Sequence, residues 1–232
     1  MKARLLLIKQ AELAWCETAI IQTDIFFFSD IGMSTALHHL RLDAVVSALL
    51  ASGVHTVADL GCGDGELMLR LREQPEFERV LGIDIDPRVI QNARQRLGLD
   101  LFSTNSRLQV RLGSFENTDW VESAVEAAVL LETIEHIEPG RLSRVEQALF
   151  GQVQPKLVLV TTPNKEYNVL HGMAAGQKRH PGHRFEWTRA QFQSWANGVA
   201  ARHAYGVTFT DIGPLDPHCG SSTQMASFMR RY

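Results

Sequence analysis

The fold of this chain is decided by residues 54–65, which read Val-His-Thr-Val-Ala-Asp-Leu-Gly-Cys-Gly-Asp-Gly. The apolar half, Val54–Leu60, predicts a short buried strand. The glycines after it allow a tight turn and let the backbone approach a ligand closely. Residues 66–73 are expected to form a helix directly afterwards. A strand, a glycine turn and a helix in this order are typical of a ligand site in an α/β fold.

The remainder of the chain continues the alternation of strands and helices. Helices are expected over residues 34–50 and over residues 87–97, where Asp86 is the N-cap of the second one. A further helix is indicated by the apolar stripe at Leu142, Val145 and Leu149. The capping box of Thr188 and Gln191 predicts the start of the last helix. Short apolar runs predict the further strands Val80–Ile83, Leu108–Leu112, Ala127–Leu131, Leu157–Val160, Tyr205–Asp211 and Thr223–Met229. Because no helix separates the last two strands, they are expected to form an antiparallel hairpin at one sheet edge. The predicted fold class is α/β, with a Rossmann-like, mostly parallel seven-stranded sheet and an antiparallel last strand.

Charge and cysteine content narrow the class of protein. In 232 residues, 23 Lys and Arg stand against 26 Asp and Glu, a net charge of −3. That balance excludes a globally basic nucleic-acid binder, but it leaves room for a local basic patch. Three cysteines without metal-type spacing indicate a reducing compartment and argue against a zinc ribbon.

Residues 1–33 are expected to form an N-terminal helical extension, because apolar residues recur at helical spacing between Leu5 and Trp15. Residues 34–232 are expected to form the main domain. The apolar run near the start of the chain ends at Lys9, too soon for a signal peptide or a membrane helix. We therefore predict a soluble, cytoplasmic protein without a membrane partner.

An acidic residue follows the glycine turn at the spacing expected for a carboxylate that binds ribose hydroxyls. Asp84 follows the second strand, 23 residues after Gly61, near the roughly 20 expected. A nicotinamide enzyme is one interpretation, but a dinucleotide fingerprint has its third glycine where this chain has Glu66. The terminal hairpin also does not fit a doubly wound dinucleotide fold. Both features resemble the class I S-adenosylmethionine (SAM) methyltransferases.

That resemblance implies SAM as the cofactor and a role for each residue around the turn. Asp84 would hold the ribose hydroxyls, and the backbone of Gly61 and Gly63 would lie along the methionine part. Ser114, just after the third strand, would fall at the adenine, and Asp59 belongs to the acidic loop. A tight glycine turn without any ligand is the alternative.

A second cluster of candidate residues follows the fourth strand. It reads Glu132-Thr133-Ile134-Glu135-His136, at a carboxyl strand end, where open α/β sheets bind ligands. If this segment begins a helix, Glu132, Glu135 and His136 share one face and converge. Two carboxylates and an imidazole would form part of the coordination shell of a divalent metal. Such a mixed set suits Mn, Fe or Co better than Mg, although Mg is also an option. A metal-free site with the same residues is the alternative.

The long connection before the last helix is a third candidate region, since loops of this length are usually functional or disordered. It carries His171, His180 and His183, which offer a further metal ligand. Residues 161–190 hold five basic side chains against two acidic ones, a local net charge of +3. Basic groups beside a metal suit a phosphate-bearing substrate, and a solvated loop is the alternative.

Three motifs together resemble the HEN-type small-RNA 2′-O-methyltransferases over residues 37–229. They are Glu132-x-x-Glu135-His136, Thr162-Pro163-Asn164 and His183-Arg184-Phe185-Glu186-Trp187-Thr188-Arg189, and Thr223-Gln224-Met225 is similar to the family's closing strand. The resemblance implies methylation of the 2′-hydroxyl on the 3′-terminal nucleotide of RNA. It also implies that a divalent metal, Mg²⁺ or Mn²⁺, is held by the catalytic residues Glu132, Glu135, His136 and His183.

Neighbouring loop residues have expected roles in the same reaction. Candidates for contacts to terminal phosphates are Lys165, Arg184 and Arg189. Phe185 and Trp187 are candidates to stack a base, with core packing as the alternative for Trp187. His180 is a candidate base, or a residue that supports the metal ligands from behind, with a solvent-exposed histidine as the alternative.

One motif of the family is altered in this chain. A Phe-x-Pro-Pro-Leu-x-x-Gln-Arg motif usually precedes the first strand, and residues 35–41 here read Thr-Ala-Leu-His-His-Leu-Arg, which keeps only Leu37 and Arg41. Two alternatives therefore stay open: a metal-free methyltransferase of a small metabolite, and a catalytically silent SAM- or RNA-binding module. The expected partners are an RNA 3′ end and a protein of RNA repair or RNA binding.

Overall fold

The computed structural model describes residues 36–99, 107–121 and 124–231. The chain divides into two compact units, Met1–Leu40 and Arg41–Tyr232. In the first unit the described residues 36–40 are helical, and the predicted helical extension of residues 1–33 lies outside the described residues. The second unit holds the sheet and every candidate site residue.

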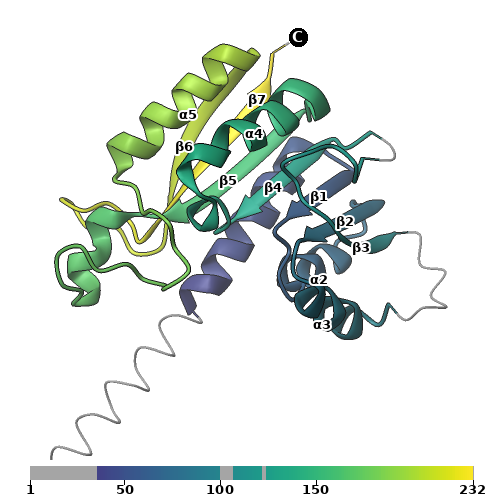
Figure 1. Cartoon of the computed structure of the whole chain (residues 1–232), viewed down its shortest axis with the longest axis horizontal. Helices are drawn as coiled ribbons and strands as arrows, with labels where there is room; N and C mark the ends of the chain where they lie inside the picture. Colours follow the sequence, from purple (N-terminus) through teal and green to yellow (C-terminus); the bar gives the residue numbers. More distant parts are fainter. Residues whose placement is uncertain (1–35, 100–106, 122–123, 232) are drawn as a thin grey trace, which may run out of the picture. The chain divides into compact units, whose positions relative to one another are not determined.

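A seven-stranded sheet runs through the second unit in the order β3-β2-β1-β4-β5-β7-β6 (Figure 1). Its strands are β1 (Thr56–Leu60), β2 (Arg79–Asp84), β3 (Leu108–Leu112), β4 (Ala127–Leu131), β5 (Leu157–Pro163), β6 (Tyr205–Ile212) and β7 (Thr223–Arg230). Strands β1 to β5 pair in parallel, and β7 runs antiparallel to both β5 and β6. The predicted α/β class, the mostly parallel sheet and the antiparallel hairpin at the edge are confirmed.

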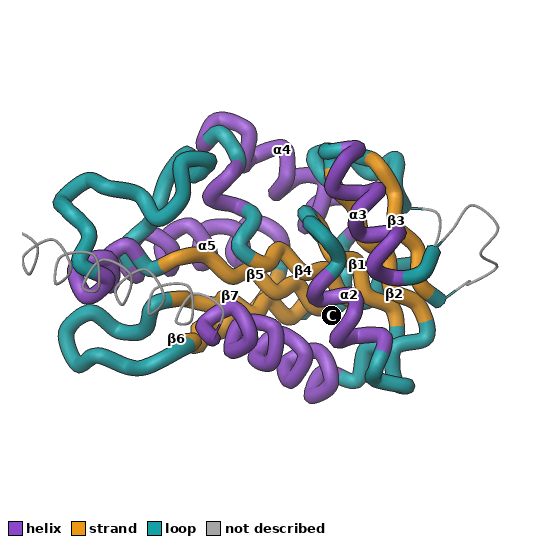
Figure 2. Tube along the Cα trace, turned by 90° about the horizontal axis from the view of Figure 1, so that it is seen from below, coloured by secondary structure: helices purple, strands orange, loops and turns teal. Residues whose placement is uncertain are grey.

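Helices cover both faces of the sheet (Figure 2). Besides helical residues 41–52, they are α2 (Glu66–Arg72), α3 (Pro87–Leu97), α4 (Leu142–Glu146), a π-helix (Gln147–Val153) and α5 (Arg189–His203). The first three share one apolar cluster with the sheet, and α4, the π-helix and α5 share a second cluster on the other face. None of the helices in the described ranges is long and apolar enough to cross a membrane.

Alternating side chains of the central strands explain these two layers. In β5, Leu157 and Leu159 belong to the first cluster, whereas Val158 and Val160 belong to the second. Each buried side chain of this size contributes roughly 1.5–3 kcal/mol to folding. A strand covered on both faces is therefore continuously apolar, as the sequence predicts for β5.

Local caps fix where the helices begin. The Asp86 side chain accepts a backbone N–H at 2.8 Å, Pro87 opens α3, and Gly98 ends it in the left-handed conformation. Thr188 and Gln191 form the predicted capping box of α5. Both predicted helix starts are therefore confirmed.

The carboxyl ends of the parallel strands carry the candidate site residues. Strand β1 leads into the glycine loop, β2 ends at Asp84, and β4 runs into Glu132. The β5–α5 and β6–β7 connections meet beside them (Figure 1), where Asn164 Nδ2 donates to the Cys219 carbonyl at 2.7 Å. This end of the sheet therefore gathers segments that are far apart in the sequence.

Candidate functional site

The glycine loop after β1 has the backbone conformation that its sequence predicts. Gly61 and Gly63 have φ angles of 80° and 52°, which residues with side chains rarely adopt. The amides of Gly61 and Cys62 both donate to the Ile83 carbonyl, at 2.8 and 3.0 Å, and fix the turn against β2. A Cβ on Gly61 would lie 2.6 Å from Thr133 Cγ2, so only glycine fits there.

Asp84 and Ser114 lie beside this loop, at the ends of β2 and β3. Asp84 Oδ2 accepts the Gly63 amide at 3.2 Å, and Oδ1 accepts the Asp86 amide at 3.0 Å. Ser114 Oγ accepts the Glu116 amide at 3.2 Å. The predicted cofactor residues therefore gather at adjacent strand ends, and their roles toward a cofactor stay predictions.

Asp59, near the end of β1, is the buried acid of this region. Its exposed fraction is 2%. Burial, and after it the charge of Asp84, raises the pKa of Asp59 to about 7. Its ionised form is therefore disfavoured by the fold in the absence of a ligand.

Replacing Asp59 by asparagine is expected to stabilise the ligand-free protein at about pH 8, by on the order of 1–3 kcal/mol. The unfolded carboxyl ionises at about pH 4, whereas the folded one ionises only near pH 7. The contribution of Asp59 to wild-type stability therefore falls as the pH rises between these values. Asparagine does not titrate, so its gain should vanish at about pH 4. Urea unfolding at both pH values measures the effect, and an equal gain at both would contradict the raised pKa.

The segment after β4 does not form an α-helix, so the predicted helical face is wrong. Ile134–His136 make a short 3₁₀ turn, and Glu132 lies outside it with a φ angle of 49°. Its amide donates to the Thr161 hydroxyl at 2.9 Å, which ties the backbone to β5 instead of to a helical turn. Tertiary contacts, rather than helical periodicity, therefore place Glu132 and Glu135.

Glu135 is fully buried and incompletely hydrogen-bonded. Its Oε2 accepts the Thr162 hydroxyl at 3.0 Å, whereas Oε1 has no hydrogen-bond partner among the described residues. Burial raises the pKa of Glu135 well above its ordinary value, and the charge of Glu132 adds to the rise. A buried carboxylate oxygen of this kind is costly unless a proton or a cation satisfies it.

Glu132 is held by Arg41, the arginine that the altered motif keeps. The Arg41 guanidinium lies 3.1 Å from Glu132 Oε2, and its Nε donates to Thr223 Oγ1 at 2.8 Å. Glu132 Oε1 accepts the Thr161 hydroxyl at 2.9 Å. Arg41 is therefore part of the site, although its motif is degraded.

Three imidazoles stand together beside the 3₁₀ turn. One nitrogen each from His136, His180 and His183 lies within 4.8 Å of the other two. The Arg184 amide donates to the Glu135 carbonyl at 2.7 Å, which brings the loop of His183 against His136. Burial, then the neighbouring imidazoles and Arg184, lowers the pKa of His136. A neutral ring keeps a lone pair for a metal ion.

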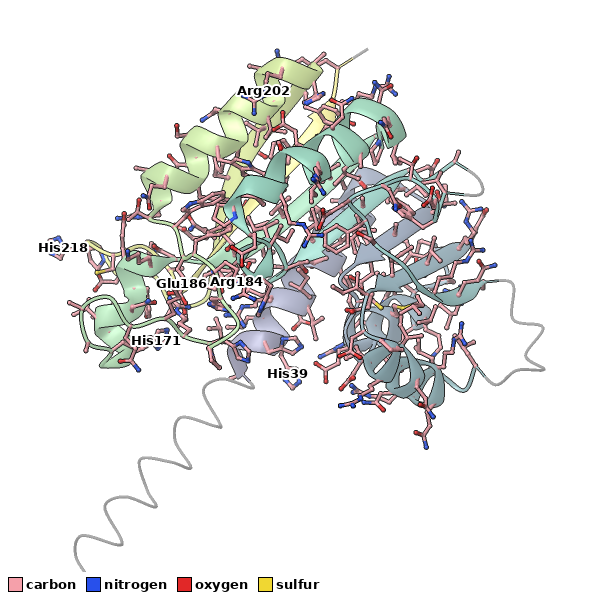
Figure 3. The ribbon with its side chains drawn as sticks, viewed as in Figure 1. His39, His171, Arg184, Glu186, Arg202 and His218 are labelled. Carbon is pink, nitrogen blue, oxygen red and sulfur yellow. The ribbon has the colours of Figure 1, made fainter. Side chains whose placement is uncertain are left out.

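Glu186, labelled in Figure 3, orients the ring of buried His183. His183 Nδ1 lies 2.6 Å from Glu186 Oε1, which leaves Nε2 as the available ligand atom. Glu186 accepts the Asn168 amide group at 2.7 Å and the Arg179 backbone amide at 2.6 Å. Burial alone would raise the pKa of Glu186, but these bonds and His183 lower it. A carboxylate behind the ring is what metal-ligating histidines usually have.

The donor atoms present fit a divalent metal ion. Neutral imidazoles together with carboxylates, one of them with an unpartnered buried oxygen, form the mixed set that suits Mn, Fe or Co. Within the described part of the chain, the 4.8 Å group contains His136 and His183 but neither Glu132 nor Glu135. The four-residue ligand set therefore stays a prediction.

The basic side chains of the long loop are largely engaged within the protein. Partly buried Arg179 donates to four oxygens of neighbouring segments, and Lys178 donates to two loop carbonyls. Arg189 pairs with Glu166 at 2.5 Å, and exposed Arg184 pairs with a glutamate at 3.1 Å. The basic side chains therefore stabilise the loop through these contacts, and some of them are also exposed to solvent.

Arg179→Met is expected to lower the free energy of unfolding by about 2–4 kcal/mol, because it removes a partly buried charged donor that joins three segments through four hydrogen bonds. The acceptors are Asn168 Oδ1, the Asn164 carbonyl and both oxygens of Ser222. Arg184→Met, which removes only an exposed ion pair, should change stability by less than about 0.5 kcal/mol. Chemical denaturation measures the free energy of unfolding of both variants. Equal losses of this free energy in the two variants would contradict the structural role of Arg179.

Two aromatic residues of the loop pack inward. Phe185 and Trp187 have ring centroids 4.3 Å apart and pack against the second core cluster. Both rings therefore pack in the core, which confirms the alternative predicted for Trp187 and extends it to Phe185. No sequence pattern predicts Thr161 as a partner of Glu132. The only signal is that Thr161 carries a hydroxyl directly after an apolar strand.

The strand order, the acidic glycine loop and the cluster after β4 define a class I methyltransferase. A family model described as a methyltransferase domain matches residues 57–156. The small RNA 2′-O-methyltransferase of Gallus gallus is 34% identical over 216 residues, covering 89% of this chain and 57% of that protein. The chain belongs to the HEN1-type small-RNA methyltransferase family.

Solved structures agree with this membership. The methyltransferase domain of bacterial CtHen1 is 39% identical with a TM-score of 0.76, over 84% of this chain and 100% of that chain. The small RNA methyltransferase HEN1 is 30% identical with a TM-score of 0.76, over 84% of this chain and 26% of that chain. The chain spans about half the length of the curated relatives it matches.

Proposed function

We propose that this chain transfers the methyl group of SAM to the 2′-hydroxyl of the 3′-terminal nucleotide of RNA, with the help of a divalent metal ion, Mg²⁺ or Mn²⁺. Its curated relatives carry the name small RNA 2′-O-methyltransferase. The chain keeps the Glu132, Glu135, His136 and His183 pattern and the glycine loop at neighbouring strand ends. Family membership and site therefore support the same reaction.

The two halves of the site are in direct contact, and this contact carries the proposal. The Thr133 hydroxyl donates to the Leu60 carbonyl at 3.2 Å, and its methyl group fills the space beside Gly61. Thr133 lies between the two candidate metal-binding glutamates. A methyl donor in the glycine loop would therefore be next to an acceptor at the cluster, and such positioning accounts for much of the rate of a two-substrate reaction.

The residues of the glycine-loop half act by binding SAM. The Asp84 carboxylate, held by two backbone amides, would accept the ribose hydroxyls. The bare backbone of Gly61 and Gly63 would admit the methionine part, and Ser114 would lie at the adenine. None of these residues needs to exchange a proton in the transfer.

The residues of the cluster act on the acceptor ribose. Glu132, Glu135, His136 and His183 would hold a divalent ion, which would supply Lewis-acid chemistry at the vicinal 2′- and 3′-hydroxyls of the acceptor ribose and so lower the pKa of the 2′-hydroxyl. Only a 3′-terminal nucleotide offers both hydroxyls, which accounts for the choice of the RNA end. Within the protein, Glu186 keeps the His183 ring in one orientation and Arg41 keeps Glu132 in place.

A comparison of RNA ends tests the proposed substrate. An RNA with free 2′- and 3′-hydroxyls should gain one methyl group, whereas the same RNA with a 3′-phosphate should react on the order of 10²-fold more slowly or worse. Mass spectrometry of the terminal nucleoside measures both. Equal methylation of the blocked RNA would contradict recognition of the 3′ end. Methylation of small metabolites but of neither RNA would indicate the metal-free alternative.

We further propose that a partner protein involved in RNA repair or RNA binding makes most of the contacts with the RNA. The chain is acidic overall, with a net charge of −3. Several basic residues of the long loop are engaged within the protein. A surface of this kind suits contact with one RNA end more than with a long duplex.

A further inference from the structure

One basic region of the chain has no part in the chemistry proposed above. Residues 87–112 contain five arginines against one acidic residue, a local net charge of +4 in a chain whose net charge is −3. The long loop of residues 161–190 reaches only +3. The region includes α3 and the edge strand β3, which pack against each other (Figure 1). A second concentration of positive charge therefore lies at the β3 edge of the sheet.

The exposed side of α3 offers hydrogen-bond donors and no carboxylate. Apart from Pro87, the exposed side chains of this helix are Arg88, Gln91, Asn92, Arg94, Gln95 and Arg96, which we call the α3 face. Guanidinium and amide groups commonly contact the phosphates and sugars of nucleic acids. A helix that only faces solvent more often carries acidic and basic residues in alternation. The composition of the α3 face therefore favours contact with a polyanion.

Arg88 is the residue of the α3 face that folding explains least. Its side chain is exposed and has no hydrogen-bond or ion-pair partner among the described residues. It lies in the first turn of α3, where the positive end of the helix dipole disfavours a basic side chain. The neighbouring carboxylate of Asp86 accepts the Arg88 backbone amide at 2.8 Å. A residue that opposes local stability in this way is expected where it serves a ligand.

Arg94 and Arg96 extend the positive charge along the helix. Arg94 Nε and Nη2 donate to a β3 carbonyl at 3.3 and 2.9 Å, which holds the guanidinium at the surface between α3 and β3. Arg96 forms exposed ion pairs with Glu66 at 3.1 Å and with Asp64 at 3.9 Å. Such pairs contribute little to stability, so a phosphate can replace them at small cost. The helix rises roughly 12 Å from Arg88 to Arg96, which leaves room for more than one phosphate.

We propose that the α3 face binds the sugar-phosphate backbone of the RNA a few nucleotides upstream of the methylated 3′ end. The first turn of α3 follows the carboxyl end of β2, and β2 lies two strands from β4, about 10 Å at the usual strand spacing. Arg88 is therefore at the same end of the sheet as the cluster after β4. The inference rests on the RNA substrate proposed above and names a surface of this chain that contacts more of it.

The affinity of the full chain for RNA tests the α3 face without an activity assay. The probe is a 5′-fluorescent single-stranded RNA of about 12 nucleotides, a length within the usual range of single-strand sites. By fluorescence anisotropy at low salt, the double variant Arg88→Gln/Arg96→Gln should bind it roughly three- to tenfold more weakly than wild type. The slope of log affinity against log salt should become shallower by roughly 1.4, about 0.7 for each lost phosphate contact.

The length of the RNA should separate this contact from the chemistry. For methylation of the long RNA, the double variant should show a raised KM and an unchanged kcat. With a dinucleotide acceptor, which is too short to reach α3, both constants should equal those of wild type. Arg88→Lys retains the charge and should retain the salt dependence. Loss of folding is not expected for Arg88→Gln, because a neutral residue suits the first turn of a helix better than a basic one.

Arg144→Gln is the matched control. Arg144 is also exposed and without a side-chain partner in the described part of the chain, but α4 packs on the other face of the sheet. This variant should bind the RNA as wild type does, and a loss equal to that of the double variant would overturn a localised face. Unchanged affinity and salt slope in the double variant would overturn the α3 face and leave the proposed methylation standing. Weakened binding in the double variant, with no RNA methylated by wild type, would support the face and contradict the proposed reaction.

Discussion

Glu135→Gln is expected to reduce 2′-O-methylation of a 3′-hydroxyl RNA by on the order of 10³-fold, with SAM binding unchanged. Polarisation by a bound metal ion is worth several kcal/mol, and each 1.36 kcal/mol corresponds to about tenfold in rate. Glu135 is the buried carboxylate whose Oε1 has no hydrogen-bond partner among the described residues. The substitution removes its charge at nearly constant shape, and the new amide oxygen can still accept the Thr162 hydroxyl. The loss should therefore come from the metal site and not from folding.

An assay of methyl transfer to RNA measures the loss of activity. Calorimetry with SAM measures whether the affinity for SAM is unchanged. Glu73→Gln is the control, because Glu73 is an exposed glutamate at the end of α2, outside the candidate site residues. It should retain full activity. The free energy of unfolding of Glu135→Gln should equal or exceed that of wild type, since an uncharged amide is cheaper to bury than a carboxylate. Wild-type activity in the Glu135 variant would contradict a metal-binding role for this residue.

Gly61→Ala is expected to weaken SAM binding by at least about 100-fold and to lower the free energy of unfolding by about 2–4 kcal/mol. The φ angle of 80° disfavours any residue with a Cβ. In addition, the new Cβ would lie 2.6 Å from Thr133 Cγ2 and 2.9 Å from Thr133 Oγ1. Relief of this contact must move either the glycine loop or the segment that carries Glu132 and Glu135. One methyl group should thus disturb both halves of the site.

Gly53→Ala separates the backbone effect from the contact. Gly53 has a φ angle of 65° and no atom within 4 Å of the position of a new Cβ. Its substitution should cost only the backbone strain, roughly 1–2 kcal/mol, and leave SAM affinity at the wild-type value. Thermal unfolding and calorimetry of both variants measure the difference. Equal SAM affinity in the two variants would contradict a close fit between Gly61 and Thr133.

The parts of the fold that depend on local chemistry could be predicted from the sequence. Strands Leu108–Leu112 and Ala127–Leu131 have their predicted bounds, because apolar runs between polar turns determine them. The start of α3 follows from the Asp86 cap, and the glycine loop follows from residues that tolerate positive φ. Residues 1–33 stay a prediction, since they lie outside the described residues.

The contacts within the site could not be predicted in the same way, because they join distant segments. Helical spacing after β4 suggested a shared face, but hydrogen bonds to β5 produce a 3₁₀ turn instead. Arg41 reaches Glu132 across the fold, and nothing in its degraded motif indicates that contact. His180 gains its neighbours only because the Arg184 amide ties the loop to the Glu135 carbonyl. Tertiary packing places these side chains, and contacts between distant segments cannot be predicted from the periodicity of a local sequence.

Anomalous scattering from a crystal soaked with Mn²⁺ tests the central claim most directly, because it locates the ion beside the glycine loop without relying on turnover. We expect an anomalous peak among Glu132, Glu135, His136 and His183. A well-diffracting soaked crystal with no peak at these four residues, or with its peak elsewhere in the molecule, would contradict it.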